Sequence, residues 1–266
     1  MGIAESWWEC ASFGLESPKE AAAIGRYAVS RALELDPLFG DGVSMLGIYS
    51  GVHDFDWAAS ERYFKQALEL DPASPDIHRR HAAYLLEPTN RLAEAHAELE
   101  TALDLDPLSP VVLAYLGQCL MFERQSDEAV ERLHESAEID PGYWMAQFLL
   151  AGAAAFQGQF EKSLAIAEAA LRATGLNPIV LGAAGSMYGL LGQRARAQEC
   201  LSGCKPPARL ATYHRWPTPG FISVCKMSKA ASTGWRKRSP NANRRSSTFP
   251  SSRCMTAFVP IRGSRR

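Results

Sequence analysis

Three histidines, two of them beside a pair of arginines, are the side chains of this sequence that first suggest a metal site. His78 and His81 are one helical turn apart and flank Arg79 and Arg80, and His96 follows in the next apolar segment. A zinc site needs three or four converging ligands, and two adjacent guanidinium groups would repel the cation. We therefore expect no metal here and interpret the histidines as interior-facing side chains that hydrogen-bond to the backbone.

The remaining polar residues do not combine into a recognisable catalytic site. Asp54, Asp56 and Asp71 stand where turns and helix caps are expected, rather than as an acid–base pair. The sequence has no phosphate-binding GxxxxGK[ST] motif, no kinase loop set and no nucleophile with a matching base. Its six cysteines lack the CxxC spacing of a zinc site or a disulfide framework. We predict a protein that is not an enzyme and that uses no cofactor.

The strongest pattern in the chain is a phrase that recurs and ends each time at a proline. Variants of Arg-Ala-Leu-Glu-Leu-Asp-Pro occupy residues 31–37, 66–72, 101–107, 135–141 and, more loosely, 169–178. The prolines are 35, 35, 34 and 37 residues apart. Self-similarity at this period is typical of solenoids, in which each unit buries its apolar face against its neighbours.

Each period contains two apolar helical stripes separated by a polar break. In the unit of residues 110–141, Ser109 followed by proline predicts a capped helix start, and Ser126 is expected to cap the second helix. The proline at position 141 then ends that helix. Ser17 begins a capping box that also contains a proline. The pattern predicts helix, turn and helix in every unit.

Small residues recur at fixed positions of the units, where they allow two helices to approach closely. In the first helix, the small residue is the glycine of a Leu-Gly pair. This pair is intact at Leu46-Gly47 and Leu116-Gly117. In the second helix they stand at Ser60, Ala95, Ala129, Ser163 and Ala197, and again at Ala32, Ala67, Ala102, Ser136 and Ala170. These positions resemble the tetratricopeptide repeat (TPR) family. The resemblance implies an all-α fold, a right-handed α-solenoid of antiparallel helix pairs. About five repeats would cover residues 17–201, after a partial leading helix in residues 1–16.

Three segments carry a narrower resemblance. Residues 15–22, 52–58 and 173–178 are similar to landmarks of the TPR regions at the C-terminal end of bacterial winged-helix regulators, serine/threonine kinases and nucleotide cyclases. The effector domains of those proteins are not recognisable in this sequence. The resemblance implies a place in a bacterial regulatory or signalling system, with the effector encoded separately or the chain a fragment.

In the TPR family the first helix of each unit lines a concave groove, which directs the choice of ligand contacts. The groove positions of this chain are mixed, and only Arg79 with Arg80 approaches the repeated basic pattern that would clamp a carboxylate. We therefore favour an apolar helix or an extended segment as ligand over an acidic peptide tail. The alternative is that Met145 and Phe148 only pack against the next unit. The expected groove residues are Ser44, Ile48, Asp76, Arg79, Gln118, Met121, Met145 and Phe148.

Residues 202–266 differ from the rest of the chain. They contain 14 of the 28 basic residues, none of the 29 acidic residues and a single leucine, Leu210. One interpretation is an irregular or disordered basic arm that binds nucleic acid. We prefer an out-of-frame translation of a repeat protein, because a one-base shift over residues 233–238 permits Trp-Leu-Ala-Glu-Ala and the helical periodicity stops near Leu201.

These observations favour a non-catalytic scaffold that binds a protein or peptide partner in its concave groove. A nucleic-acid-associated protein acting through the basic tail is the alternative, and nucleic acid is not expected to bind elsewhere. Apolar runs are too short for a membrane span, and the N-terminus lacks the basic-then-apolar order of a secretory signal. We expect a cytoplasmic protein.

Overall fold

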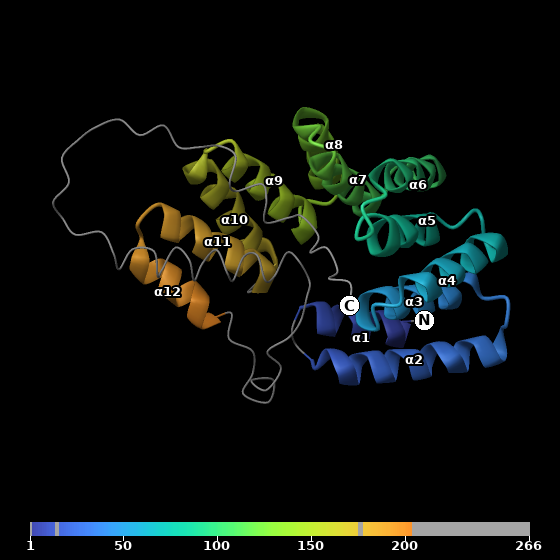
Figure 1. Ribbon diagram of the computed structural model, residues 1–266. Helices are drawn as coiled ribbons and strands as arrows, with labels where there is room; N and C mark the ends of the chain where they lie inside the picture. Colours follow the sequence, from blue (N-terminus) through green and yellow to red (C-terminus); the bar gives the residue numbers. More distant parts are fainter. Residues whose placement is uncertain (1, 14–15, 175–177, 204–266) are drawn as a thin grey trace, which may run out of the picture.

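The computed structural model describes residues 2–13, 16–174 and 178–203, and within these ranges it contains helices and no strands. The interpretations of residues 202–266 therefore lie almost entirely outside the described residues. The helices follow one another as antiparallel hairpins arranged in an arch (Figure 1). The hairpins are α1 (Gly2–Ser12) with α2 (Pro18–Leu35); α3 (Gly40–Ile48) and its π-helical continuation η1 (Tyr49–His53) with α4 (Trp57–Leu70); α5 (Pro75–His81) and the π-helical η2 (Ala82–Leu86) with α6 (Leu92–Leu105); α7 (Pro110–Phe122) with α8 (Ser126–Ile139); α9 (Trp144–Phe156) with α10 (Phe160–Thr174); and α11 (Pro178–Leu190) with α12 (Arg194–Gly203). The all-α, paired-helix solenoid expected from the sequence is confirmed.

Serine–proline pairs begin three of the helices, as expected for Ser17 and Ser109. The hydroxyls of Ser17, Ser74 and Ser109 each accept a hydrogen bond from the backbone N–H three residues later. The expectation that Ser126 caps α8 is wrong. The chain turns sharply before α8, where the N–H of Gln125 bonds to the carbonyl of Leu120 at 2.9 Å, so that Ser126 is already the first helical residue.

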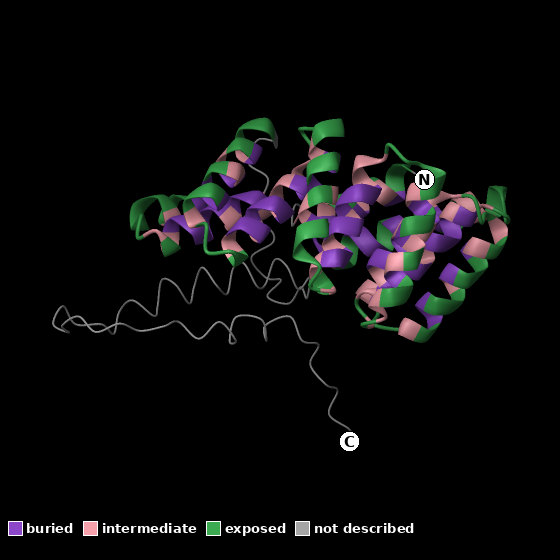
Figure 2. Ribbon diagram, turned by 90° about the horizontal axis from the view of Figure 1, so that it is seen from above, coloured by how far each residue is buried: buried purple, intermediate pink, exposed green. Residues whose placement is uncertain are grey.

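Small residues hold the two helices of a hairpin close together. A Cβ atom added at Gly117 would lie 2.7 Å from Cγ of Leu133. One added at Gly47 would lie 2.9 Å from the ring of Phe64. In the α9–α10 hairpin, the hydroxyl of Ser163 donates to a backbone carbonyl of α9 at 2.7 Å. Buried residues consequently lie where helices face each other, and exposed residues lie on the outside (Figure 2).

The two 35-residue periods contain a local structural adjustment that the 34-residue period lacks. In both, the first helix ends in a π-helical turn, η1 or η2, whereas α7 runs without one. A π-helical turn takes up one extra residue without breaking the helix. The extra residue of each longer period is therefore placed at the end of the first helix.

The turn inside each of five hairpins contains a residue with left-handed backbone. These residues are Phe55, Asn90, Arg124, Gly158 and Gly192, with φ between 60° and 76°. Glycine adopts this conformation at little cost, whereas a residue with a Cβ atom is strained in it. The first three positions are thus filled by residues that the turn does not favour, although asparagine tolerates it best.

From α3 onward, the first helix of each hairpin packs on the first helix of the next hairpin. These first helices form the inner side of the solenoid. Along the chain α3 packs on α5, α5 on α7, α7 on α9 and α9 on α11. The ring of Phe13, which follows α1, lies 5.4 Å from the ring of Trp144 at the start of α9, although three hairpins separate them in sequence. We call the surface formed by α3, η1, α5, η2, α7 and α9 the inner face. None of the described helices is long and apolar enough to cross a membrane.

Candidate functional site on the inner face

An arginine and three tyrosines from consecutive hairpins form the centre of the inner face. The guanidinium of Arg79 lies over the ring of Tyr115, 5.2 Å from its centroid. The hydroxyl oxygens of Tyr84 and Tyr115 are 3.2 Å apart and share a hydrogen bond. Tyr143, beyond them on the approach to α9, donates its hydroxyl to the sulfur of Met145 at 3.6 Å. We call Arg79, Tyr84, Tyr115 and Tyr143 the tyrosine cluster.

The tyrosine cluster keeps a positive charge beside neutral phenols. Burial alone would lower the pKa of Arg79, but Tyr115, Tyr84 and Asp76 together raise it above its ordinary value. Burial raises the pKa of Tyr115 and of Tyr143, so both remain protonated at neutral pH. The cluster therefore combines a charged guanidinium with aromatic rings on one surface.

A second arginine, Arg80, is almost completely buried beneath the inner face, with 5% of its surface exposed. Its Nη1 donates to the carboxylate of Asp41 at 2.9 Å and to the hydroxyl of Ser44 at 3.0 Å. Its Nη2 donates to Glu5 of α1 at 2.7 Å. A buried guanidinium needs such partners, because an unpaired buried charge is strongly destabilising. Three hairpins are thereby joined at one side chain.

The groove residues predicted in the first two full units have different surroundings. Ser44 and Ile48 are buried, Ser44 bonding to the carbonyl of Asp41 and Ile48 lying in the core with α1 and α4. Asp76 is exposed and pairs with Arg79, whose Nη2 lies 2.7 Å from its carboxylate. Of these four residues, the structure places Asp76 and Arg79 together.

The groove residues predicted in the later units lie along α7 and α9. Gln118 donates to Glu87 at 2.8 Å, and Met121 is half-buried between two core clusters. Met145 is buried, whereas Phe148 is half-buried with its ring 6.4 Å from that of Trp144. Both also pack in the core shared by α7, α8 and α9. Met145 and Phe148 therefore pack in the core, and their contact with a ligand stays a prediction.

The sequence interpretation missed the tyrosines, although one signal could have found two of the central residues. Tyr115 directly precedes the Leu116-Gly117 pair, and Arg80 directly precedes the relaxed pair at His81. In both units, the residue before the pair contacts the first helix, or its π-helical continuation, in the preceding hairpin. Tyr115 contacts Tyr84, and Arg80 contacts Asp41. Tyr84 and Tyr143 carry no comparable signal, because they lie at other positions of their units.

The three histidines bind carboxylates. His78 and His81 both face Glu98 of α6, with Nδ1–carboxylate distances of 2.5 and 3.3 Å, and His78 also contacts the carbonyl of Pro72. His96 faces Glu123 at 2.8 Å. The expected backbone bonding is thus found only for the second nitrogen of His78. Across the described ranges, no group of three or more His, Cys, Asp and Glu side chains could hold a metal ion.

Glu98 and His78 stabilise each other's charge. Burial alone would raise the pKa of Glu98, but hydrogen bonds from His78 and His81 lower it to about 2. The hydrogen bond to Glu98 in turn raises the pKa of His78. This group links α5 to α6.

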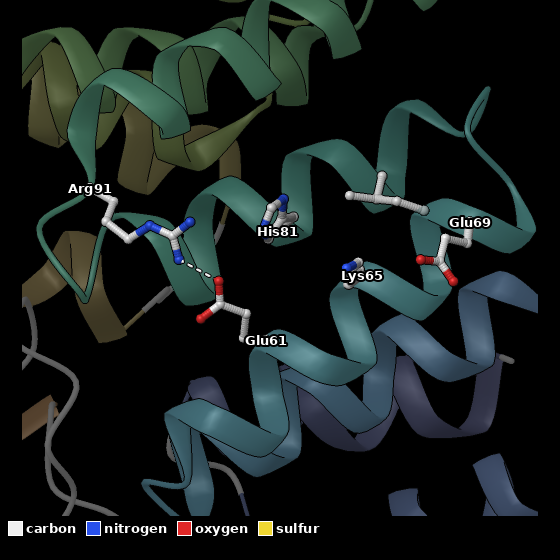
Figure 3. A pocket seen from close by; sticks show the side chains of 6 residues that line it. Glu61, Lys65, Glu69, His81 and Arg91 are labelled. Carbon is white, nitrogen blue, oxygen red and sulfur yellow. Dashed lines mark hydrogen bonds and ion pairs between the residues drawn. The ribbon is translucent and has the colours of Figure 1, made fainter.

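A separate hollow of about 360 Å³ lies between α4 and the start of α6, with His81 at its wall (Figure 3). Arg91 donates across it to Glu61 at 2.9 Å and also pairs with Glu94. The remaining lining is a lysine, a leucine and a second glutamate. Charges of both signs already neutralise one another there, so the hollow offers less for recognition than the inner face.

Comparison with known proteins identifies the fold. No protein-family model and no curated protein matches the chain. Among solved structures, PilW, a type IV pilus biogenesis factor, is 18% identical with a TM-score of 0.58, covering 84% of this chain and 96% of that chain. TTC0263, a TPR protein of Thermus thermophilus, is 16% identical with a TM-score of 0.59, covering 73% and 99%. A chain of the APC/C hetero-tetramer Cut9–Hcn1 is 13% identical with a TM-score of 0.59, covering 80% of this chain and 40% of that one. The fold is that of a tetratricopeptide repeat protein.

Proposed function

We propose that this protein is a non-catalytic scaffold that binds a segment of a partner protein along its inner face. The observation that carries the proposal is the tyrosine cluster, in which an arginine and three tyrosines from consecutive hairpins meet on one surface. Tyrosine, tryptophan and arginine are the residues that most often dominate the energy of protein–protein binding. A helical or extended segment would lie across the first helices and contact the cluster and Phe148.

The aromatic residues of the inner face are placed to take part in such binding. Tyr115, Tyr143 and Trp144 are half-buried, so each rests on the core while part of its surface remains accessible. Such anchoring limits the rotamer freedom that a binding surface would otherwise lose. The Cut9–Hcn1 structure, described as a hetero-tetramer, supports the idea that this kind of fold takes part in protein assemblies.

The proposed setting is a bacterial regulatory or signalling system in the cytoplasm. It is supported by the similarity of residues 15–22, 52–58 and 173–178 to TPR regions of winged-helix regulators, kinases and cyclases. A partner could then be an effector domain encoded by a neighbouring gene.

Photo-cross-linking in the source organism tests the proposal. The photoreactive residue benzoylphenylalanine is placed at Phe148 of the inner face and, as matched control, at the exposed Glu131 of α8. We expect a discrete protein adduct from position 148 and none of the same mass from position 131. Adducts from position 131 alone would refute the inner face as the binding surface.

A further inference from the structure

The N-terminal helix α1 contacts the inner face through long side chains. Glu5 pairs with Arg80 of α5, with 2.7 Å between the carboxylate and Nη2. The indole of Trp8 meets the rings of Tyr49 and Tyr84 edge-on, at centroid distances of 6.0 and 5.4 Å. The carbonyl of Ala4 accepts a hydrogen bond from the Tyr49 hydroxyl at 3.1 Å. Every one of these partners belongs to a first helix or its π-helical continuation.

These contacts reach beyond the hairpin that neighbours α1 in the stack. Arg80 and Tyr84 belong to the second hairpin along, and Phe13 touches Trp144 of the fourth. Glu9 also lies in the field of Arg79, which opposes the rise in the pKa of Glu9 caused by burial. Helix α1 therefore lies across the inner face beside the tyrosine cluster, where a bound segment would lie.

Helix α1 packs on α2 within its hairpin as well as on the inner face, but it is short. It has 11 residues, and isolated helices of this length are marginal in water, so its helicity depends on packing. Its contacts use a carboxylate and an indole one turn apart, while Ile3 and Ser6 are exposed. If α1 left, the Nη2 group of Arg80 would lose its carboxylate, and a replacement would have to supply one.

We infer that the inner face takes an amphipathic helix bearing a carboxylate and an indole one turn apart, and that α1 holds this place until such a partner helix displaces it. This inference rests on the proposed function and specifies the chemistry of the partner. Because α1 is covalently linked to the solenoid, its effective concentration at the inner face is about millimolar. A helix supplied from outside must therefore compete with α1 for the same surface. Weakening the attachment of α1 should therefore strengthen binding of a helix supplied from outside.

A labelled peptide of residues 2–13 tests this inference by fluorescence anisotropy. It is titrated with the full-length chain and with the full-length E5A/W8A variant. We expect the variant to bind the peptide at least tenfold more tightly than the unchanged chain. A peptide carrying E5A/W8A should not bind, whereas one carrying changes at the exposed Ile3 and Ser6 should bind as the native peptide does.

Two further variants make the outcome decisive. Arg80→Met in the E5A/W8A background should abolish the gain in affinity, because the guanidinium no longer meets the carboxylate of the peptide. If E5A/W8A does not fold, Glu5→Gln gives the same comparison with a smaller expected gain of about threefold. Equal affinity of the unchanged and variant chains, or equal binding of native and E5A/W8A peptides, would overturn the inference. A cross-link from position 148 combined with either result would leave the inner face as the binding surface and refute only the role of α1.

Discussion

The buried carboxyl group of Glu87 should make the stability of the protein depend on pH. Glu87 follows η2, its Oε2 accepts a hydrogen bond from Gln118 at 2.8 Å, and its Oε1 is buried without a hydrogen-bond partner among the described residues. Burial raises the pKa of Glu87 from about 4.5 to about 8, although Gln118 opposes the rise. The carboxyl group is therefore protonated in the folded protein at neutral pH, whereas it is ionised in the unfolded chain.

The sign of the pH dependence follows from this difference. Below the unfolded pKa the group is protonated in both states, and the folded state bears no cost. As pH rises from about 4.5 to about 8, the unfolded chain gains stability by releasing its proton, and the folded state loses stability relative to it. Each pKa unit corresponds to about 1.4 kcal/mol, which gives a cost of about 3 kcal/mol at pH 7. Because part of the Glu87 side chain reaches solvent, we expect about 2 kcal/mol.

Glu87→Gln replaces the titratable carboxyl group by a neutral amide, whose oxygen can still accept the hydrogen bond from Gln118. Urea unfolding should show the variant more stable than the unchanged chain by about 2 kcal/mol at pH 7 and by nearly nothing at pH 4. Glu131→Gln, at an exposed glutamate of α8, is the matched control and should leave stability unchanged at both pH values. A Glu87→Gln variant that is equally stable at pH 7, or that gains the same amount at pH 4, would refute the reasoning.

Four further substitutions have expected outcomes in unfolding experiments. Gly117→Ala places a Cβ atom 2.7 Å from a leucine of α8 and should lower the free energy of unfolding by about 1–2 kcal/mol. Gly152→Ala meets nothing within 4 Å and should raise the free energy of unfolding by up to about 1 kcal/mol. A Gly117→Ala variant more stable than the Gly152→Ala variant would contradict the packing. Arg124→Gly relieves a φ of +66° and should raise the free energy of unfolding by about 0.5–1 kcal/mol, and a loss of stability would contradict this. Glu98→Gln removes the partner that raises the pKa of His78. The stabilisation that His78 contributes is present below pH 6.5 and lost as pH rises through its raised folded pKa. The variant should therefore lose about 2 kcal/mol at pH 5.5 and less at pH 9, and an equal loss at both would argue against this ion pair.

The fold could be predicted because its signals are local and repeated. Proline at the end of each unit, serine before proline at helix starts and glycine at helix crossings act within one hairpin or between adjacent helices. Ser109 and Gly117 have the roles that their positions predict. Ser126 does not, since the preceding turn enters the helix one residue earlier than the cap pattern predicts.

The candidate site could be predicted only in part, because it depends on how the hairpins curve. The position of α1 across the inner face joins Trp8 to Tyr84 and Phe13 to Trp144, and no spacing in the sequence relates these residues. Curvature likewise decides which side chains meet at Arg80. The groove roles of Met145 and Phe148 stay predictions, since both residues also pack in the core.

The most direct test of the inner face as the binding surface is the affinity of the partner segment found by cross-linking, measured by isothermal titration calorimetry. Phe148→Ala should raise its Kd by at least tenfold, because truncating a central aromatic residue of an interface commonly costs about 2 kcal/mol. Glu131→Ala, on the exposed side of α8, should change the Kd by less than about twofold, as expected for a residue outside the interface. An unchanged Kd for Phe148→Ala together with a large loss for Glu131→Ala would contradict binding at the inner face.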